Sequence, residues 1–126
     1  MSGLLLDSNV LVWWLDDAPR LRGSAIAARI AVEPVVMVSV VSPWELWIKA
    51  RSGRIGLPGR LNERLPELDL QIISPTLGDA RLAAALPPIH KDPFDRMIVA
   101  QAMNRRATIV TSDALFRDYG VDVILV

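Results

Sequence analysis

The sequence has 126 residues, of which 52% are hydrophobic, so it is large enough to bury a core without disulfides or a structural metal. Its 14 basic residues balance 14 acidic residues, which excludes a strong overall positive field. The absence of cysteine excludes disulfides and thiolate metal sites. No signal-like segment or apolar run of about 18 residues is present. We therefore expect one soluble, cytoplasmic domain over residues 1–126 that is not membrane-bound.

The first third of the chain predicts two strands and two helices. A short apolar run at residues 4–6 predicts a buried strand, and the apolar residues 10–15 predict a helix after the intervening polar residues. The alanine-rich segment 24–32 predicts a second helix. The β-branched residues 35–41 predict the second strand.

The middle of the chain predicts three helices around a strand. Ser42 as N-cap and Pro43 at the first helical position predict a helix that ends at Gly53. Residues 57–65 predict a short helix and residues 70–73 a third strand. A further helix is expected over residues 77–86, where it ends at a pair of prolines.

The last third opens with the clearest helix, which Asp92 and Pro93 begin and which runs to about residue 105. Residues 108–111 predict a strand, residues 112–119 a short helix and residues 121–125 a final strand. Strands that alternate with helices are typical of an α/β fold. We expect a three-layer α/β/α domain with a central, mostly parallel sheet of about five strands.

Four acidic residues lie where such a sheet binds ligands. Asp7 directly follows the first predicted strand, and Asp113 lies two residues after the strand 108–111. Glu45 lies in the helix after the second strand, and Asp95 lies in the first turn of the longest helix. Open parallel sheets bind ligands at the carboxyl ends of their strands. We therefore expect all four acids to face one crevice.

Each of these acids also has a structural explanation. Asp7 is suited to cap a helix, and Asp113 is suited to a helix N-terminus. Asp92 with Asp95 three positions later imitates a capping box, and for Asp92 we prefer this explanation. Glu45 has a lysine four residues later, which favours an ion pair on a helix surface. The tryptophans, leucine and isoleucine around Glu45 argue against an exposed face.

The four acids together indicate a metal site. Carboxylates that gather without balancing lysines repel one another, and a bound divalent cation is the usual remedy. Oxygen ligands suit Mg²⁺ or Mn²⁺, whereas a chain with no cysteine and one histidine is poorly suited to zinc. Such a cation activates a water molecule for attack on a phosphodiester.

Four segments of the sequence resemble one known family. These segments are residues 4–14 (LLLDSNVLVWW), 42–49 (SPWELWIK), 90–102 (HKDPFDRMIVAQA) and 110–113 (VTSD). Their order and spacing are similar to those of PIN-domain toxins of the VapC type, and the similarity covers essentially the whole chain. Asn9 stands where many members of this family have histidine.

The resemblance implies a PIN-like fold and a metal-dependent endoribonuclease that acts as the toxin of a VapBC-type toxin–antitoxin pair. Asp7, Glu45, Asp95 and Asp113 would be the catalytic and metal-site acids for Mg²⁺, with Mn²⁺ as a substitute. We expect Asp7 and Asp95 to be the firmest ligands, with Glu45 and Asp113 binding directly or orienting water. The implied partners are RNA, a VapB-type antitoxin and a second copy of the chain.

Further polar residues near these acids are candidates to bind RNA or support the site: Ser8, Lys49, Arg51, Arg54, His90, Asp92, Arg96 and Ser112. We prefer a capping role for Ser8 and a structural or merely exposed role for His90. The basic residues are candidates for phosphate contacts or ion pairs, and Arg96 for pairing with a site acid. For the four tryptophans we prefer core or interface packing to base stacking.

Three other functions fit parts of the pattern. A Mg²⁺-dependent phosphatase or phosphotransferase also uses aspartates at strand ends, but it commonly has a second aspartate where this chain has Asn9. A signalling receiver domain needs an aspartate at the end of the third strand, where residues 70–75 have none. A catalytically silent PIN domain that binds RNA or a partner is the third alternative.

Overall fold

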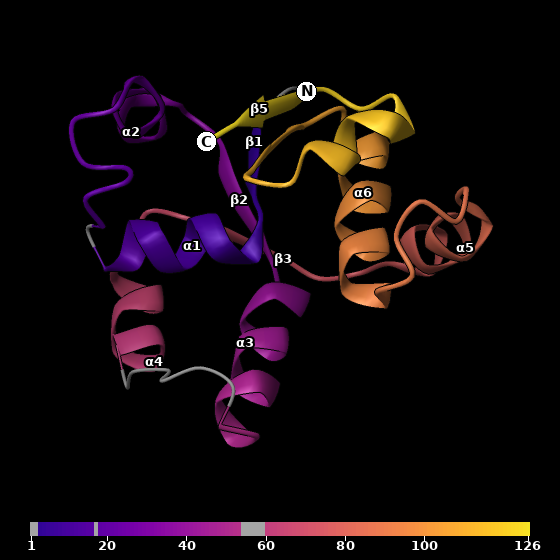
Figure 1. The fold of residues 1–126 in the computed structure, drawn as a ribbon, viewed down its shortest axis with the longest axis horizontal. Helices are drawn as coiled ribbons and strands as arrows, with labels where there is room; N and C mark the ends of the chain where they lie inside the picture. Colours follow the sequence, from indigo (N-terminus) through magenta and orange to yellow (C-terminus); the bar gives the residue numbers. More distant parts are fainter. Residues whose placement is uncertain (1–2, 17, 54–59) are drawn as a thin grey trace.

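The computed structural model describes residues 3–16, 18–53 and 60–126, and at its centre lies a parallel sheet of five strands in the order β3-β2-β1-β4-β5 (Figure 1). All four neighbouring pairs of strands are parallel, which confirms the predicted sheet. The strands are β1 (Leu4–Leu6), β2 (Val36–Ser39), β3 (Gln71–Ile73), β4 (Thr108–Thr111) and β5 (Val123–Leu125).

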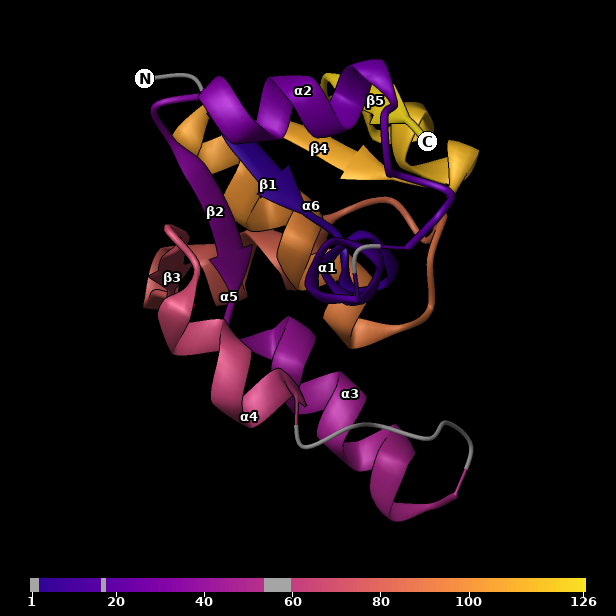
Figure 2. The ribbon, with the colours of Figure 1, turned by 90° about the vertical axis from the view of Figure 1, so that its left-hand side faces the viewer.

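Helices cover both faces of the sheet (Figure 2). One face carries α1 (Ser8–Leu15), α2 (Ala25–Val32) and residues of α4 (Arg60–Arg64). The other carries α6 (Pro93–Arg105), which packs against α5 (Leu77–Ala85), and a 3-10 helix, η2 (Ala114–Tyr119). The remaining helix, α3 (Val41–Arg51), extends together with α4 beyond the end of the sheet. A short 3-10 helix, η1 (Leu65–Glu67), follows α4. The chain therefore has the predicted three-layer α/β/α arrangement.

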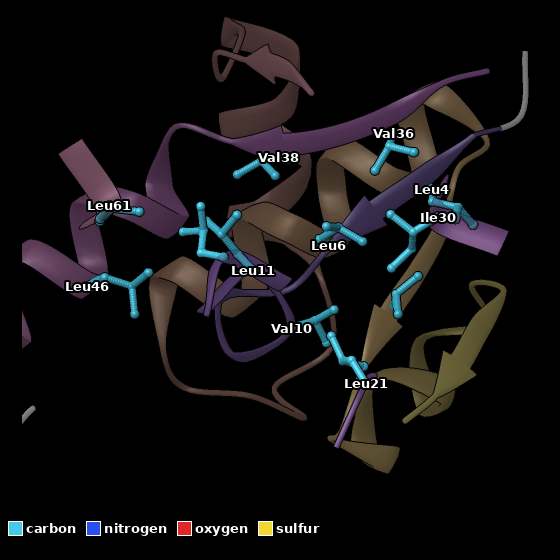
Figure 3. Packing of buried hydrophobic residues seen from close by; sticks show 12 residues of the cluster. Leu4, Leu6, Val10, Leu11, Leu21, Ile30, Val36, Val38, Leu46 and Leu61 are labelled. Atoms are coloured by element: carbon cyan, nitrogen blue, oxygen red, sulfur yellow. The ribbon is translucent and has the colours of Figure 1, made fainter. Parts of the chain in front are cut away.

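The alternation of side chains along the strands produces two hydrophobic cores. Leu4 and Leu6 of β1 point into the core beneath α1 and α2, where they meet buried residues of β2 and β4 (Figure 3). Leu5 of the same strand points the other way, into the core beneath α6 and η2. A three-residue strand that is buried on both faces fixes its register strongly, because a slip by one residue would exchange the two cores.

The structure corrects two predicted element boundaries. The second strand ends at Ser39 rather than at residue 41, and α3 begins at Val41, so Ser42 is not the N-cap. The N-cap is Val40, which offers no side-chain cap, and the Ser39 hydroxyl accepts a hydrogen bond from the Val41 backbone N–H (3.2 Å). The helix predicted over residues 112–119 begins at Ala114, because Asp113 is its N-cap, and it is a 3-10 helix.

The helix expected over residues 57–65 falls partly outside the described residues; within them it covers Arg60–Arg64. None of the helices in the described parts of the chain is long and apolar enough to cross a membrane.

A buried acid away from the sheet end joins α5 to α6. Asp79 is 1% exposed and forms a reciprocal capping box with Thr76. Its carboxylate also accepts hydrogen bonds from Asn104 (2.7 Å) and Arg105 (3.3 Å). Burial opposes ionisation, but these hydrogen bonds and the Arg105 charge hold the pKa of Asp79 below its ordinary value.

We expect the Asp79→Ala substitution to lower the free energy of unfolding by about 2 kcal/mol, because it removes half of the capping box of α5 and the acceptor of the hydrogen bonds from Asn104 and the partly exposed Arg105. Urea unfolding followed by circular dichroism measures the change. The loss should shrink as the pH falls and Asp79 is protonated, because a lowered pKa stabilises the folded state only while the carboxylate is ionised. An Asp118→Ala variant, at an exposed position, is the control, and equal stability of the two variants would contradict this role.

Candidate active site

The four predicted acids come together at the carboxyl end of the sheet. Asp7 follows β1 and Asp113 follows β4, the strand paired with β1. Glu45 lies on α3 and Asp95 in the first turn of α6, two helices that pack against each other. The charge of Asp113 acts on Asp7, and the charges of Asp7 and Glu45 act on Asp95. One electrostatic cluster therefore contains all four carboxylates.

Asp7 is buried, and both of its carboxylate oxygens accept hydrogen bonds. Oδ1 accepts from the Ser8 backbone N–H (2.8 Å), which makes Asp7 the N-cap of α1. Oδ2 accepts from the Thr111 hydroxyl (2.7 Å). Burial raises the pKa of Asp7 above its ordinary value and outweighs these two hydrogen bonds, which favour the ionised form. The structural explanation for Asp7, a helix cap, is thus correct and compatible with a place in the site.

Glu45 is also buried, at 6% exposure, and it is held by two partners. The Ser8 hydroxyl donates to Oε1 (2.9 Å), and the Lys49 ammonium lies 3.4 Å from Oε2. The expected i,i+4 pair with Lys49 is therefore present. The expectation that Ser8 caps a helix was wrong, because Asp7 takes that position and leaves the Ser8 hydroxyl free to orient Glu45.

Asp95 has no hydrogen bond or ion pair with any residue that the structure describes, and it is half-buried. Burial raises its pKa to about 7, with further upward contributions from the charges of Asp7, Asp92 and Glu45. The predicted capping box with Asp92 is absent, because Asp92 alone caps α6 by accepting from the Phe94 backbone N–H (2.8 Å). The Asp95 carboxylate is thus left facing other acids.

Asp113 differs from the other acids because a histidine holds it. The His90 Nε2 lies 2.8 Å from the Asp113 Oδ2. His90 is buried, and the Tyr119 hydroxyl accepts from its backbone N–H (2.7 Å) and lies 3.2 Å from its Nδ1. Burial opposes ionisation of Asp113, but hydrogen bonds from His90 and Leu115 hold its pKa below the ordinary value. The structure places His90 as the partner of Asp113, in agreement with the preference for a structural role.

The donor chemistry of this cluster suits a hard divalent cation. It offers carboxylate oxygens alone, Asp7 and Asp95 have raised pKa values, and Asp95 has no cationic partner within the described residues. Among those residues, however, no group of three Asp, Glu or His side chains is arranged to hold a metal ion. The hydrogen bonds from Ser8, Thr111 and His90 each engage one oxygen of a site carboxylate and leave acceptor capacity on Glu45, Asp7 and Asp113. Metal binding therefore requires the carboxylates to be rearranged, while these hydrogen bonds can be kept.

Arg96, expected to contact phosphate or a site acid, is committed to the backbone instead. Its guanidinium donates to carbonyl oxygens of the segment that joins α5 to α6, at distances of 2.7 to 3.4 Å: Ala83, Ala84, Leu86, Pro87 and His90. These carbonyls belong to the end of α5 and the turn after it, where no helical N–H is available to them. Arg96 therefore fixes the segment that carries His90.

The other described residues predicted to support the site form no hydrogen bond or ion pair with its acids. Arg51 is exposed at the end of α3, and Asn9, the departure from the family pattern, is exposed on α1. The Ser112 side chain is half-buried next to Asp113 and forms no hydrogen bond with a described residue. Arg54 lies outside the described residues.

Two residues that support the site were missed from the sequence, namely Thr111, which holds Asp7, and Tyr119, which holds His90. Thr111 is buried at the end of β4. Its contact with Asp7 follows from the register of β1 and β4, because Leu6 pairs with Val110 and the next residues, Asp7 and Thr111, then lie side by side. Tyr119 carries no local signal, because its partner His90 lies 29 positions away in the chain.

Comparison with known proteins agrees with this geometry. Residues 4–122 match the PIN domain family. The chain is 33% identical over 124 residues to Ribonuclease VapC22 from Mycobacterium tuberculosis, and the match covers 94% of this chain and 93% of the relative. The fold is similar to a chain of a toxin–antitoxin complex from Klebsiella pneumoniae, with a TM-score of 0.69 at 22% identity over 97% of this chain and 96% of that one.

A second solved structure with this fold is VapBC2 from Rickettsia felis bound to a DNA fragment from its promoter. The TM-score is 0.72 at 16% identity, and the match covers 99% of this chain and 98% of the other. Family match, sequence identity and the cluster of acids at the sheet end all agree: the chain belongs to the PIN-domain family, as a member of the VapC type.

Proposed function

We propose that this chain is a metal-dependent endoribonuclease that cleaves RNA phosphodiester bonds. The observation that carries the proposal is the convergence of Asp7, Glu45, Asp95 and Asp113 at one end of the sheet, two of them with raised pKa values. A relative at 33% identity over nearly the whole chain is named a ribonuclease, which supports the same activity.

The four acids are the proposed Mg²⁺ or Mn²⁺ site. Asp7 and Asp95 are the principal ligands, and Glu45 and Asp113 bind directly or orient water. When bound, the cation supplies charge neutralisation and activation of water for attack at phosphorus. The chain's own contribution is positional: Ser8 orients Glu45, Thr111 orients Asp7 and His90 orients Asp113.

We further propose that the chain is the toxin of a toxin–antitoxin pair, forms homodimers and binds a VapB-type antitoxin. The solved relatives from Klebsiella pneumoniae and Rickettsia felis are toxin–antitoxin complexes, which supports this assignment. A catalytically silent PIN domain is the alternative that a cleavage assay separates. A phosphatase has lost its support, because the chain belongs to a different family.

Cleavage of a mixed RNA pool with Mg²⁺ or Mn²⁺ tests the activity, with an Asp7→Asn variant prepared in parallel. We expect the variant to lose at least about 100-fold in rate, because a metal ligand is removed. Asn is as good a helix N-cap as Asp, so α1 should remain intact, and a thermal melt checks this. An Asp118→Asn variant at an exposed site should cleave like wild type. Equal cleavage by wild type and Asp7→Asn would contradict the proposed site.

We expect the stability of the metal-free protein to depend on Asp95. Its pKa in the folded protein, about 7, lies above the ordinary value of 3.8. The contribution of protonated Asp95 to the free energy of unfolding is therefore complete below pH 3.8 and is lost as the pH rises through 7. The Asp95→Asn variant should therefore be more stable than wild type at pH 8 in EDTA, and the difference should shrink towards pH 4. Urea unfolding at a series of pH values measures it, and a difference independent of pH would refute the explanation.

Metal binding is testable apart from catalysis. Mn²⁺ should raise the melting temperature of wild type, since a ligand at 100 times its Kd adds about 2.7 kcal/mol to the free energy of unfolding. The rise should be much smaller for Asp95→Asn, which lacks one proposed ligand, and unchanged for Asp118→Asn. If Mn²⁺ raises all three melting temperatures equally, the cation binds elsewhere.

A further inference from the structure

Two aromatic rings border the acid cluster. Trp44 immediately precedes Glu45 on α3, and Phe94 immediately precedes Asp95 on α6. Their ring centroids lie 5.0 Å apart, with the ring planes at 78°. The contact between α3 and α6 thus brings together an aromatic pair and, beside it, two of the four acids.

Trp44 remains largely open to solvent although it has an aromatic partner. Its exposed fraction is 53%, whereas Phe94 is partly buried and packs against the core beneath α6. An edge-to-face contact with an anchored ring restrains the orientation of Trp44. The Trp44 ring is therefore restrained, but not buried, at the contact between α3 and α6, the two helices that carry Glu45 and Asp95.

We propose that Trp44, supported by Phe94, is a stacking platform for an unpaired base of a single-stranded RNA substrate. The inference rests on the proposed ribonuclease function and deepens it, because it assigns a substrate-positioning residue and a substrate class. Aromatic side chains stack on every base and thus bind single strands with little sequence preference.

Charge explains why a ribonuclease of this composition needs such a platform. The chain is neutral overall, with 14 basic and 14 acidic residues, and its acids are gathered where the phosphate must bind. Lys49, the cation next to Glu45, is already paired with it at 3.4 Å, and Arg96 is committed to backbone carbonyls. Lys49 and Arg96 are thus already engaged by protein groups, whereas stacking on an aromatic ring does not depend on side-chain charge.

The other tryptophans have different surroundings, which makes one of them a control. Trp13 and Trp14 are half-buried against the core, and Trp13 lies beneath the Arg20 guanidinium at 4.3 Å. Trp47 is 45% exposed on the same helix as Trp44, but its indole N–H donates to Asn62 of α4 at 2.9 Å. Trp47 therefore matches Trp44 in residue type, helix and exposure. The two differ in their partner helix, because Trp47 contacts α4 and Trp44 contacts α6.

The test measures binding of a fluorescein-labelled 12-nucleotide single-stranded RNA to protein that carries Asp7→Asn, so that the RNA is not cleaved. Trp44→Leu should raise the Kd about tenfold through the loss of one stacked base. Trp44→Phe, which keeps an aromatic face, should retain most of the affinity, and Trp47→Leu should match the parent. Circular dichroism melts verify that each variant is folded.

A spectroscopic signal separates stacking from a structural role. RNA should quench the tryptophan fluorescence of the parent, and this quenching should be lost in Trp44→Phe although RNA still binds. Duplex RNA, whose bases are already stacked, should bind the parent and Trp44→Leu equally.

Two results would overturn the platform. If wild type cleaves RNA, and Trp44→Leu neither weakens RNA binding in the Asp7→Asn background nor slows cleavage in the wild-type background, the platform is wrong and the ribonuclease proposal stands. If wild type protein neither binds nor cleaves single-stranded RNA, the proposed function itself fails and the platform with it.

Discussion

Burial of the Asp7 carboxylate at the end of the central strand is the constraint around which the site is arranged. A charge in that position is costly unless its oxygens are paired, and the neighbouring strand supplies Thr111 while the following helix supplies its first N–H. Both partners exist because β1 lies between β2 and β4 in a fixed register. The hydrogen bonds do not cancel the cost, since the pKa of Asp7 remains raised by burial. The carboxylate of Asp7 thus remains destabilised in its ionised form, which is the condition that the proposed cation would relieve.

The acids also show that structural and chemical roles are combined in the same residues. Asp7 and Asp113 each cap a helix with one oxygen, and the cap fixes the direction of the other oxygen. The hydrogen bond from Ser8 fixes the orientation of the Glu45 carboxylate in the same way, and the contact with His90 fixes that of Asp113. For Asp7, Glu45 and Asp113 the structural role of the acid is therefore also the means by which its carboxylate is held in place.

The sequence allowed prediction of the sheet, most helices and the convergence of the acids, because apolar runs, caps and strand ends are local signals. Interactions between distant segments were not predictable in this way. Thr111 meets Asp7 across 104 positions, and the Arg96 contacts exist only because α5 ends beside α6. The tryptophans show a related limit: their spacing on α3 fixes their relative directions, but the exposure of Trp44 and Trp47 depends on how α4 and α6 pack against that helix.

The first turn of α6 is connected to two of the four acids, Asp95 and Asp113. Asp95 belongs to the acid cluster directly, while the adjacent Arg96 grips the carbonyl of His90, whose ring holds Asp113. One turn of α6 therefore supplies Asp95 and, through Arg96 and His90, a chain of hydrogen bonds that reaches Asp113. A substitution that disturbs this turn would bear on two carboxylates that belong to different elements of the fold.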